Sequence, residues 1–198
     1  MAFLAMCALY APQPLLPRFA RAFAVSETRA ALLIAVALLP LSIAPLSFGV
    51  LLRRFATARV LQAAAFALAV LVAAQAVAPS FAWMVGLRLG QGVAIAAILT
   101  ALMTHVATFA RDEAVPRVMA WYVTATILGG LLGRLLAGFF AEYVSWSLYF
   151  VMLGGALAAG GAVSSRLERR RPDASSRKQA GGRPFVDVLR SGRYVRVY

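Results

Sequence analysis

The sequence predicts an all-α integral membrane protein with six transmembrane helices. Of its 198 residues, 62% are hydrophobic and only 14% are charged, a balance more apolar than that of soluble proteins. The apolar residues gather in six blocks, most of them close to or above the ~20 residues that cross a bilayer as a helix. These blocks are residues 1–16, 30–52, 60–78, 81–109, 118–141 and 144–163. We therefore assign residues 1–164 to a six-helix transmembrane bundle.

The first two blocks contain proline. Block 1–16 runs into residues 12–17 (PQPLLP), which cannot continue as regular helix because proline lacks an amide hydrogen and clashes with the preceding turn. No Lys or Arg precedes this block, so we interpret it as a first membrane helix rather than a signal peptide. Pro40 and Pro45 fall inside the second block and predict a kinked helix whose freed carbonyls are satisfied by neighbouring helices.

The third block carries no charged residue, whereas the fourth contains Arg88, Gln91 and Gly92. An arginine in hydrocarbon costs at least about 2.5 kcal/mol, so such residues usually face a bundle interior or a watery path. The spacing of three and four residues puts all of them on one helix face. Arg88 then either lines a central cavity, where it attracts an anionic group or favours ionisation of a neighbouring carboxylate, or is a structural arginine bonded to backbone carbonyls or Gln13.

The fifth block combines small residues with a second arginine. Small residues on one face let another helix approach closely. The glycines of this stripe are Gly129, Gly130, Gly133 and Gly138. Arg134 lies among them and has two interpretations: it adds positive potential to the outer part of a cavity, or its long side chain snorkels outward to water. The sixth block is also rich in glycine and completes the bundle.

Basic residues between the blocks predict the orientation. With a cytoplasmic N-terminus, most of the 20 Lys and Arg residues lie on the cytoplasmic side, while Arg18, Arg21 and Arg29 lie outside. This asymmetry favours both ends being cytoplasmic. Residues 165–198 form a basic cytoplasmic linker, in which the apolar spacing of residues 184–190 suits a short amphipathic helix on the membrane.

Two of these motifs resemble those of a transporter family. Arg88, Gln91 and Gly92 match Arg-x-x-Gln-Gly on its fourth helix, and the glycine stripe matches Gly-x-x-x-Gly-Pro-x-x-Gly-Gly on its fifth, with Arg134 replacing the proline and Ala137 a glycine. The chain thus resembles the N-terminal half of a bacterial drug or sugar efflux-type member of the major facilitator superfamily. The resemblance implies the N-terminal bundle of a major facilitator fold, multi-pass in the bacterial cytoplasmic (inner) membrane.

A third motif lies between the second and third blocks. The family carries Gly-x-Leu-Ala-Asp-Arg-x-Gly-Arg-Lys there, and the aspartate is thought to lock the two halves in one state. In this chain Arg53 stands in place of the aspartate and Ala56 in place of the second glycine. The resemblance assigns the cytoplasmic gate loop to Gly49, Leu51, Arg53, Arg54 and Arg59.

The resemblance implies a secondary active transporter, with proton-coupled efflux of a small molecule by rocking of two bundles around a mid-membrane site. Its expected partners are the lipid bilayer, a small-molecule substrate and a C-terminal six-helix half. Two alternatives stay open, namely a self-contained six-helix protein that dimerises as a half-transporter and a non-functional fragment. No Asp or Glu lies in the apolar centre of any block, so a proton-carrying carboxylate would come from outside this chain.

Other classes of protein are disfavoured. One cysteine and one histidine leave no metal-ligand spacing and point to no cofactor. An enzyme needs convergent nucleophiles, acids or metal ligands in one site, and the sequence offers none. The net charge is +13. The basic residues that produce it lie mostly between the apolar blocks and in the tail, as expected for residues that set membrane topology, and not on a polar surface that would bind nucleic acid.

Overall fold

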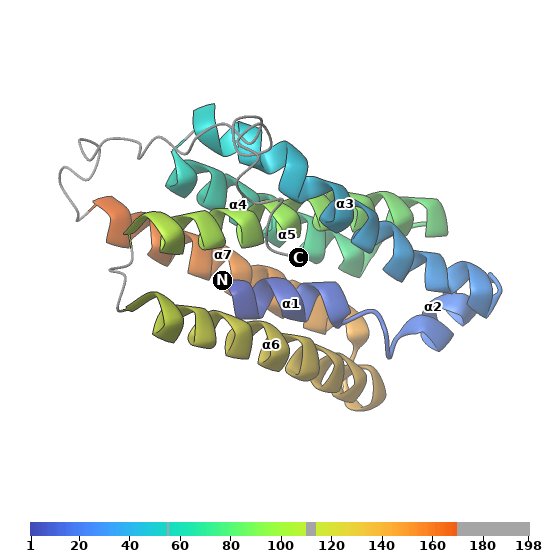
Figure 1. Ribbon diagram of the computed structural model, residues 1–198. Coiled ribbons are helices and arrows are strands. Elements are labelled where there is room, and N and C mark those ends of the chain that lie inside the picture. Colours follow the sequence, from blue (N-terminus) through green and yellow to red (C-terminus); the bar gives the residue numbers. More distant parts are fainter. Residues whose placement is uncertain (55, 110–113, 170–198) are drawn as a thin grey trace, which may run out of the picture.

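The structure is a computed structural model that describes residues 1–54, 56–109 and 114–169, and it leaves the side chains of residues 44–54, 107–109 and 165–169 undescribed. Within these ranges every regular element is a helix (Figure 1). The helices are α1 (Ala2–Tyr10), α2 (Leu16–Ala22), α3 (Glu27–Arg54), α4 (Thr57–Ala74), the 3₁₀ helix η1 (Gln75–Val77), α5 (Phe81–Phe109), α6 (Val115–Tyr143) and α7 (Trp146–Arg169).

Each predicted block contains a helix, but the number of membrane spans differs from the prediction. Among the described residues, four helices are long and apolar enough to cross a membrane, or five if α2 and the following part of α3, bent by 119°, count as one span. Helix α1 has 9 residues, or ~14 Å at 1.5 Å per residue, against an apolar core about 30 Å thick. The prediction of an all-helical membrane bundle is therefore confirmed, whereas the prediction of six spanning helices is not established.

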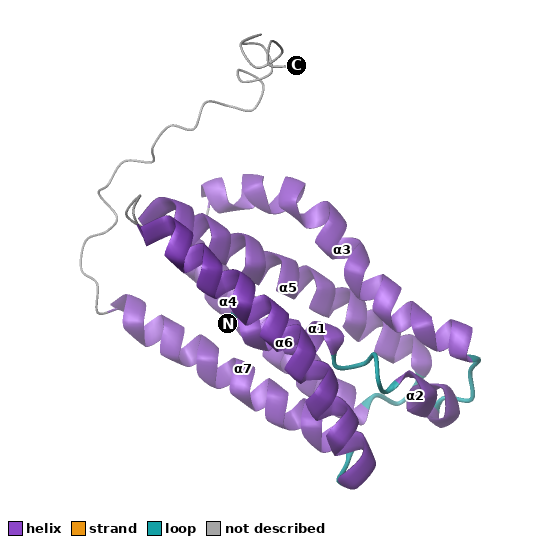
Figure 2. Cartoon of the chain, turned by 60° about the horizontal axis from the view of Figure 1, so that its bottom comes forward, coloured by secondary structure: helices purple, strands orange, loops and turns teal. Residues whose placement is uncertain are grey.

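Proline shapes the first part of the chain. Helix α1 ends at Tyr10, just before residues 12–17, as predicted. Pro17 lies in the first turn of α2, where a missing amide hydrogen costs no hydrogen bond. Pro40 lies within α3, which remains one helix to Arg54, and Figure 2 shows the axis of α3 bending along its length. Short α2 was not anticipated from the sequence.

Helix α5 lies at the centre of the bundle. In its most apolar stretch 56% of the residues are buried, because α1, α3 and α4 pack around it while α7 packs on α4 (Figures 1 and 2). Helix α6 rests mainly on α1, and only 22% of its most apolar stretch is buried. A helix that is apolar all round belongs in a core, and α5 is the helix that carries Arg88.

Aromatic packing fixes α2 at one end of the bundle. The ring of Phe19 is fully buried and meets that of Trp146 on α7 edge to face, with centroids 5.4 Å apart. Phe23 continues the cluster to Phe81 at the start of α5, with centroids 6.3 Å apart. Such pairs add about 0.5–1.5 kcal/mol beyond area burial. The turn between α1 and α3 is thereby held against the ends of α5 and α7.

Candidate functional site

Arg88 is completely buried and its guanidinium bonds to two other helices. Nε donates to the carbonyl oxygen of Leu33 on α3 at 3.0 Å. Nη1 and Nη2 donate to the carbonyl oxygens of Ala8 and Leu9 on α1, at 3.1 and 2.7 Å. Nη1 also donates to Oε1 of Gln91 at 2.8 Å, within α5. The relative exposure of Arg88 is 0%, so this buried cation is solvated by the protein itself.

The end of α1 explains why its carbonyls are available. The last four carbonyls of a helix lack intrahelical partners, and α1 ends one residue after Leu9. A positive group at this end also interacts favourably with the helix dipole. Arg88 therefore acts as a C-terminal cap for α1 that is supplied by another helix. Of the two sequence interpretations, its contacts are those of an arginine bonded to backbone carbonyls.

Gln91 and Gly92 extend the contacts of α5 on the same face. Nε2 of the buried Gln91 donates to the carbonyl oxygen of Leu71 on α4 at 3.0 Å. A Cβ at Gly92 would overlap the carbonyl oxygen of Ala37 and lie 3.1 Å from Cδ of Pro40. Glycine is thus required where α3 crosses α5. Together these three residues join α1, α3 and α4 to the central helix.

The glycine stripe of α6 faces α1. A Cβ at Gly133 would stand 2.6 Å from Cα of Cys7, and one at Gly129 would overlap the carbonyl oxygen of Phe3. Real Cβ atoms do not come this close, so the crossing depends on glycine. Gly130 accommodates the ring of Tyr10, whereas Gly138 only approaches Pro14 at ordinary contact distance.

Arg134 belongs to a second polar cluster at the same crossing. Its Nε donates to Oε1 of Gln13, in the turn after α1, and its Nη1 donates to the carbonyl oxygen of Gly130 at 3.2 Å. The guanidinium carbon lies 4.1 Å from the ring centroid of Tyr10, within the range of a cation–π interaction. Gln13, which the sequence offered as a partner for Arg88, is instead a partner of Arg134.

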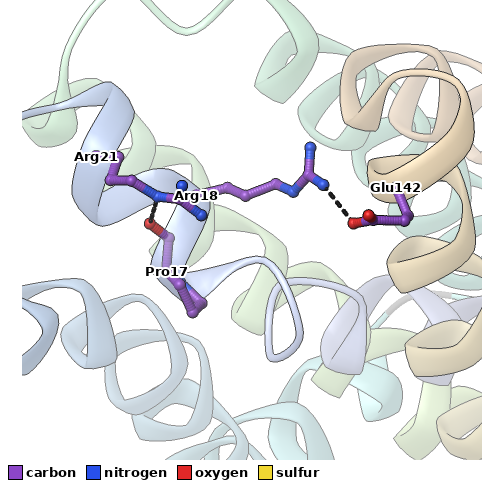
Figure 3. A network of polar contacts seen from close by, with 4 residues as sticks. All are labelled: Pro17, Arg18, Arg21 and Glu142. Atoms are coloured by element: carbon purple, nitrogen blue, oxygen red, sulfur yellow. Dashed lines mark hydrogen bonds and ion pairs between the residues drawn. The ribbon is translucent and has the colours of Figure 1, made fainter.

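An exposed ion pair links α2 to the end of α6. Nη2 of Arg18 lies 2.8 Å from Oε2 of Glu142, and Nε of Arg21 donates to the carbonyl oxygen of Pro17 at 3.2 Å (Figure 3). The side chains of Arg18 and Glu142 are 38% and 68% exposed, so solvent screens the pair and its contribution stays within about 1 kcal/mol. It marks the end of the bundle but does not hold it together.

The proposed gate residues lie apart from these clusters. The segment from Gly49 to Arg54 is helical and completes α3, but its side chains lie outside the described residues. Arg59 is exposed in the first turn of α4. Among the described residues, no group of three His, Cys, Asp or Glu could hold a metal ion.

Sequence reasoning missed one buried polar residue, Gln75. It is 0% exposed, its Nε2 donates to the sulfur of Met84 at 3.3 Å, and its Oε1 has no hydrogen-bond partner. The available signal was a second glutamine near the end of the third block, which carries no charged residue.

A bundle of long apolar helices with a fully buried arginine that bonds to two neighbouring helices is the architecture of a multi-pass membrane protein. Residues 1–197 match the model of the Major Facilitator Superfamily. The chain belongs to this family, whose members are transporters rather than enzymes.

Similar proteins are also named as transporters. The chain is 30% identical, over 146 residues, to the uncharacterized MFS-type transporter YybF of Bacillus subtilis, and this alignment covers 74% of the chain and 36% of YybF. An uncharacterized transporter of Buchnera aphidicola from Schizaphis graminum is 28% identical over 146 residues, covering 74% of the chain and 35% of that protein. The chain thus aligns with about a third of the length of these relatives.

Proposed function

We propose that the chain forms the N-terminal bundle of a secondary active transporter that exports a small molecule in exchange for protons. Family membership supports transport, and the alignment with only 36% of YybF supports a larger working unit. In such transporters two bundles rock around a mid-membrane site. We assign one bundle to this chain and the other to a C-terminal six-helix half.

The buried Arg88 network is the observation that carries this proposal. Rocking requires a bundle to move as a unit. Arg88 and Gln91 donate to carbonyls on α1, α3 and α4 from the centre of the bundle, while Gly92 lets α3 close on α5. We therefore propose that Arg88 is a positioning residue that keeps these four helices together during transport.

The part-buried Arg134 is the proposed cavity residue. It contributes positive potential to the outer part of a substrate path between the two halves. The acids whose side chains the structure describes, Glu27 and Glu142, lie at the start of α3 and near the end of α6, so we assign the proton-carrying carboxylate to the C-terminal half. The proposed cytoplasmic gate residues are Gly49, Leu51, Arg53, Arg54 and Arg59.

The proposed setting is the bacterial cytoplasmic membrane, with both ends of the chain cytoplasmic. The distribution of basic residues supports this topology. Trp83, Tyr143 and Trp146 lie at the beginning of α5, the end of α6 and the beginning of α7, where amphipathic rings favour a headgroup layer. Residues 165–198 are the proposed basic linker, and residues 170–198 lie outside the described part of the chain.

The exposed face of α6 also suits a dimeric half-transporter. Ile127, Leu131, Leu135 and Phe139 are between 48% and 65% exposed on this helix, and lipid, a second half or a second copy of the chain would each cover them. Transport by the 198-residue chain alone would favour the dimer, whereas transport only by a longer reading frame would favour the second half.

The test uses everted membrane vesicles energised with a proton gradient, with a panel of labelled small molecules added to the external medium. The longer reading frame, the 198-residue chain and Arg88→Ala in the longer frame are compared at equal protein levels. We expect proton-dependent accumulation of a substrate only with the intact longer frame. Accumulation that is unaffected by Arg88→Ala would contradict the role given to the buried network.

A further inference from the structure

The cluster of Arg134, Gln13 and Tyr10 holds a positive charge without a carboxylate partner. Glu142, the described acid on the same helix, pairs with Arg18, and the described residues give Arg134 only the Gln13 oxygen and a backbone carbonyl. A guanidinium keeps its charge at all ordinary pH values. The cluster therefore presents a permanent cation in a helix long and apolar enough to span a membrane.

Several donors of this cluster remain unused. Nη2 of Arg134, Nε2 of Gln13 and the hydroxyl of Tyr10 make no hydrogen bond in the part of the chain that the structure describes. None of them is among the buried side-chain atoms without a partner, a set that within the described residues contains only Oε1 of Gln75. These donors are thus accessible, and a ligand can reach them without breaking an existing contact.

The same contacts hold the guanidinium in place. The Gln13 oxygen and the Gly130 carbonyl fix two of its nitrogens, and the ring of Tyr10 covers one face at 4.1 Å. Gly130 leaves room for this stacking, because a Cβ there would lie 3.1 Å from Cδ2 of Tyr10. Donors that are held before a ligand arrives lose less entropy on binding.

Arg88 and Arg18 are not available to a ligand in the same way. Arg88 is fully buried, and all three of its guanidinium nitrogens donate to protein oxygens. Arg18 is already paired with Glu142 in an exposed position. Arg134 is nine residues before the end of α6 at Tyr143, which corresponds to about 13 Å along the helix.

We propose that Arg134, Gln13 and Tyr10 form a binding site for an oxyanion, in which Nη2 of Arg134 and Nε2 of Gln13 donate to two oxygens of one carboxylate or phosphate group. Charge-assisted bonds of this kind are stronger than neutral ones and are little screened away from bulk water. Taken with the proposed transport function, on which this part rests, the substrate class is a small organic anion. The site itself does not depend on transport.

An oxyanion can come from a soluble molecule or from a lipid headgroup, and both have the same chemistry at this site. Binding is therefore measured on the 198-residue chain in maltoside micelles, which contain no phosphate. The probe is benzoate, with the isosteric neutral benzamide as its control, and competition is measured with inorganic phosphate and with phosphatidylglycerol. Displacement by inorganic phosphate identifies a site for soluble anions, and displacement by the lipid alone identifies a headgroup site.

Benzoate is expected to bind at least about tenfold more tightly than benzamide, because each hydrogen bond to a charged group contributes a factor of this order. Arg134→Gln should remove the preference, Gln13→Leu should reduce it, and Arg134→Lys should retain part of it. Arg21→Gln, which removes an exposed cation from α2, serves as the matched control and should bind as the wild type. Equal affinity for both probes, or benzoate binding unchanged in Arg134→Gln, would overturn the site.

These experiments can contradict the proposed anion site and the proposed transport function independently. Benzoate binding without transport by the longer frame would contradict the proposed transport and leave the oxyanion site standing. Transport of neutral molecules only, by a protein that does not prefer benzoate, would overturn the anionic substrate class and leave the transporter standing.

Discussion

Nη2 of Arg88 donates a 2.7 Å hydrogen bond to the carbonyl oxygen of Leu9, one residue before the end of α1. The bond places a cation from the central helix at the end of a nine-residue helix that is short of a full membrane span. It explains how α1 is retained in the bundle.

Replacing Arg88 by leucine should destabilise the bundle by about 3 kcal/mol or more, because buried carbonyls on α1 and α3 lose charged donors. Cys7 is the single cysteine, and its thiol is buried on α1. A thiol-reactive fluorophore therefore reports on α1 as the protein is heated in detergent. Arg88→Lys, which keeps the charge but has fewer donors, should fall between. A Cys7 labelling midpoint unchanged in Arg88→Leu would show that α1 does not depend on this arginine.

Adding a methyl group at Gly133 should force α6 away from α1. The new Cβ would stand 2.6 Å from Cα of Cys7, and overpacking of this kind costs about 1–3 kcal/mol. Gly155→Ala is the matched control, since a Cβ there meets no atom within 4 Å. Labelling of Cys7 should become faster in Gly133→Ala and stay unchanged in Gly155→Ala. Equal rates in the two variants would rule out the close crossing.

Removing the charge of Glu142 should have little effect on stability. Its partner Arg18 lies 2.8 Å away, but both side chains are exposed, and such pairs contribute about 0–1 kcal/mol. A double-mutant cycle of Arg18→Gln and Glu142→Gln, measured by thermal unfolding in detergent, gives the coupling energy. A coupling well above this range would mean that the pair is shielded from water, as a covering second bundle would cause.

Replacing Gln75 by methionine should preserve or raise stability. Its Oε1 is buried without a partner, and exchanging an unsatisfied polar group for an apolar one of similar shape is near neutral or favourable. Thermal unfolding of Gln75→Met is the measurement, with Gln91→Met as a contrast because Gln91 is fully bonded at both ends. A larger loss for Gln75→Met than for Gln91→Met would reveal a function for the glutamine oxygen.

Sequence patterns predicted the helices better than the contacts between them. Apolar blocks located the long helices, and residues 12–17 located the end of α1, because both signals are local. The bonds of Arg88 could not be assigned, since backbone carbonyls exist at every residue and only the tertiary fold selects Ala8, Leu9 and Leu33. For the same reason the pairing of Gln13 with Arg134 was not foreseen.

The length of the first helix was also not predicted correctly from the sequence. Block 1–16 is apolar apart from Gln13, yet only residues 2–10 form α1, because the prolines of residues 12–17 place a turn between α1 and α2. The sequence pattern predicts a glycine stripe, but which of its glycines are indispensable depends on where α1 crosses. Gly129 and Gly133 meet its backbone, whereas Gly138 has ordinary contacts.

The most direct test of the proposed transporter is proton-dependent accumulation of a labelled small molecule in everted vesicles. A protein that joins this chain to the proposed C-terminal half should accumulate substrate when a proton gradient is imposed, lose accumulation when the gradient is collapsed, and lose it with Arg88→Ala at equal protein level. Accumulation that is the same with and without the gradient would contradict proton-coupled transport. Accumulation undiminished in Arg88→Ala would contradict a bundle held together by its buried arginine.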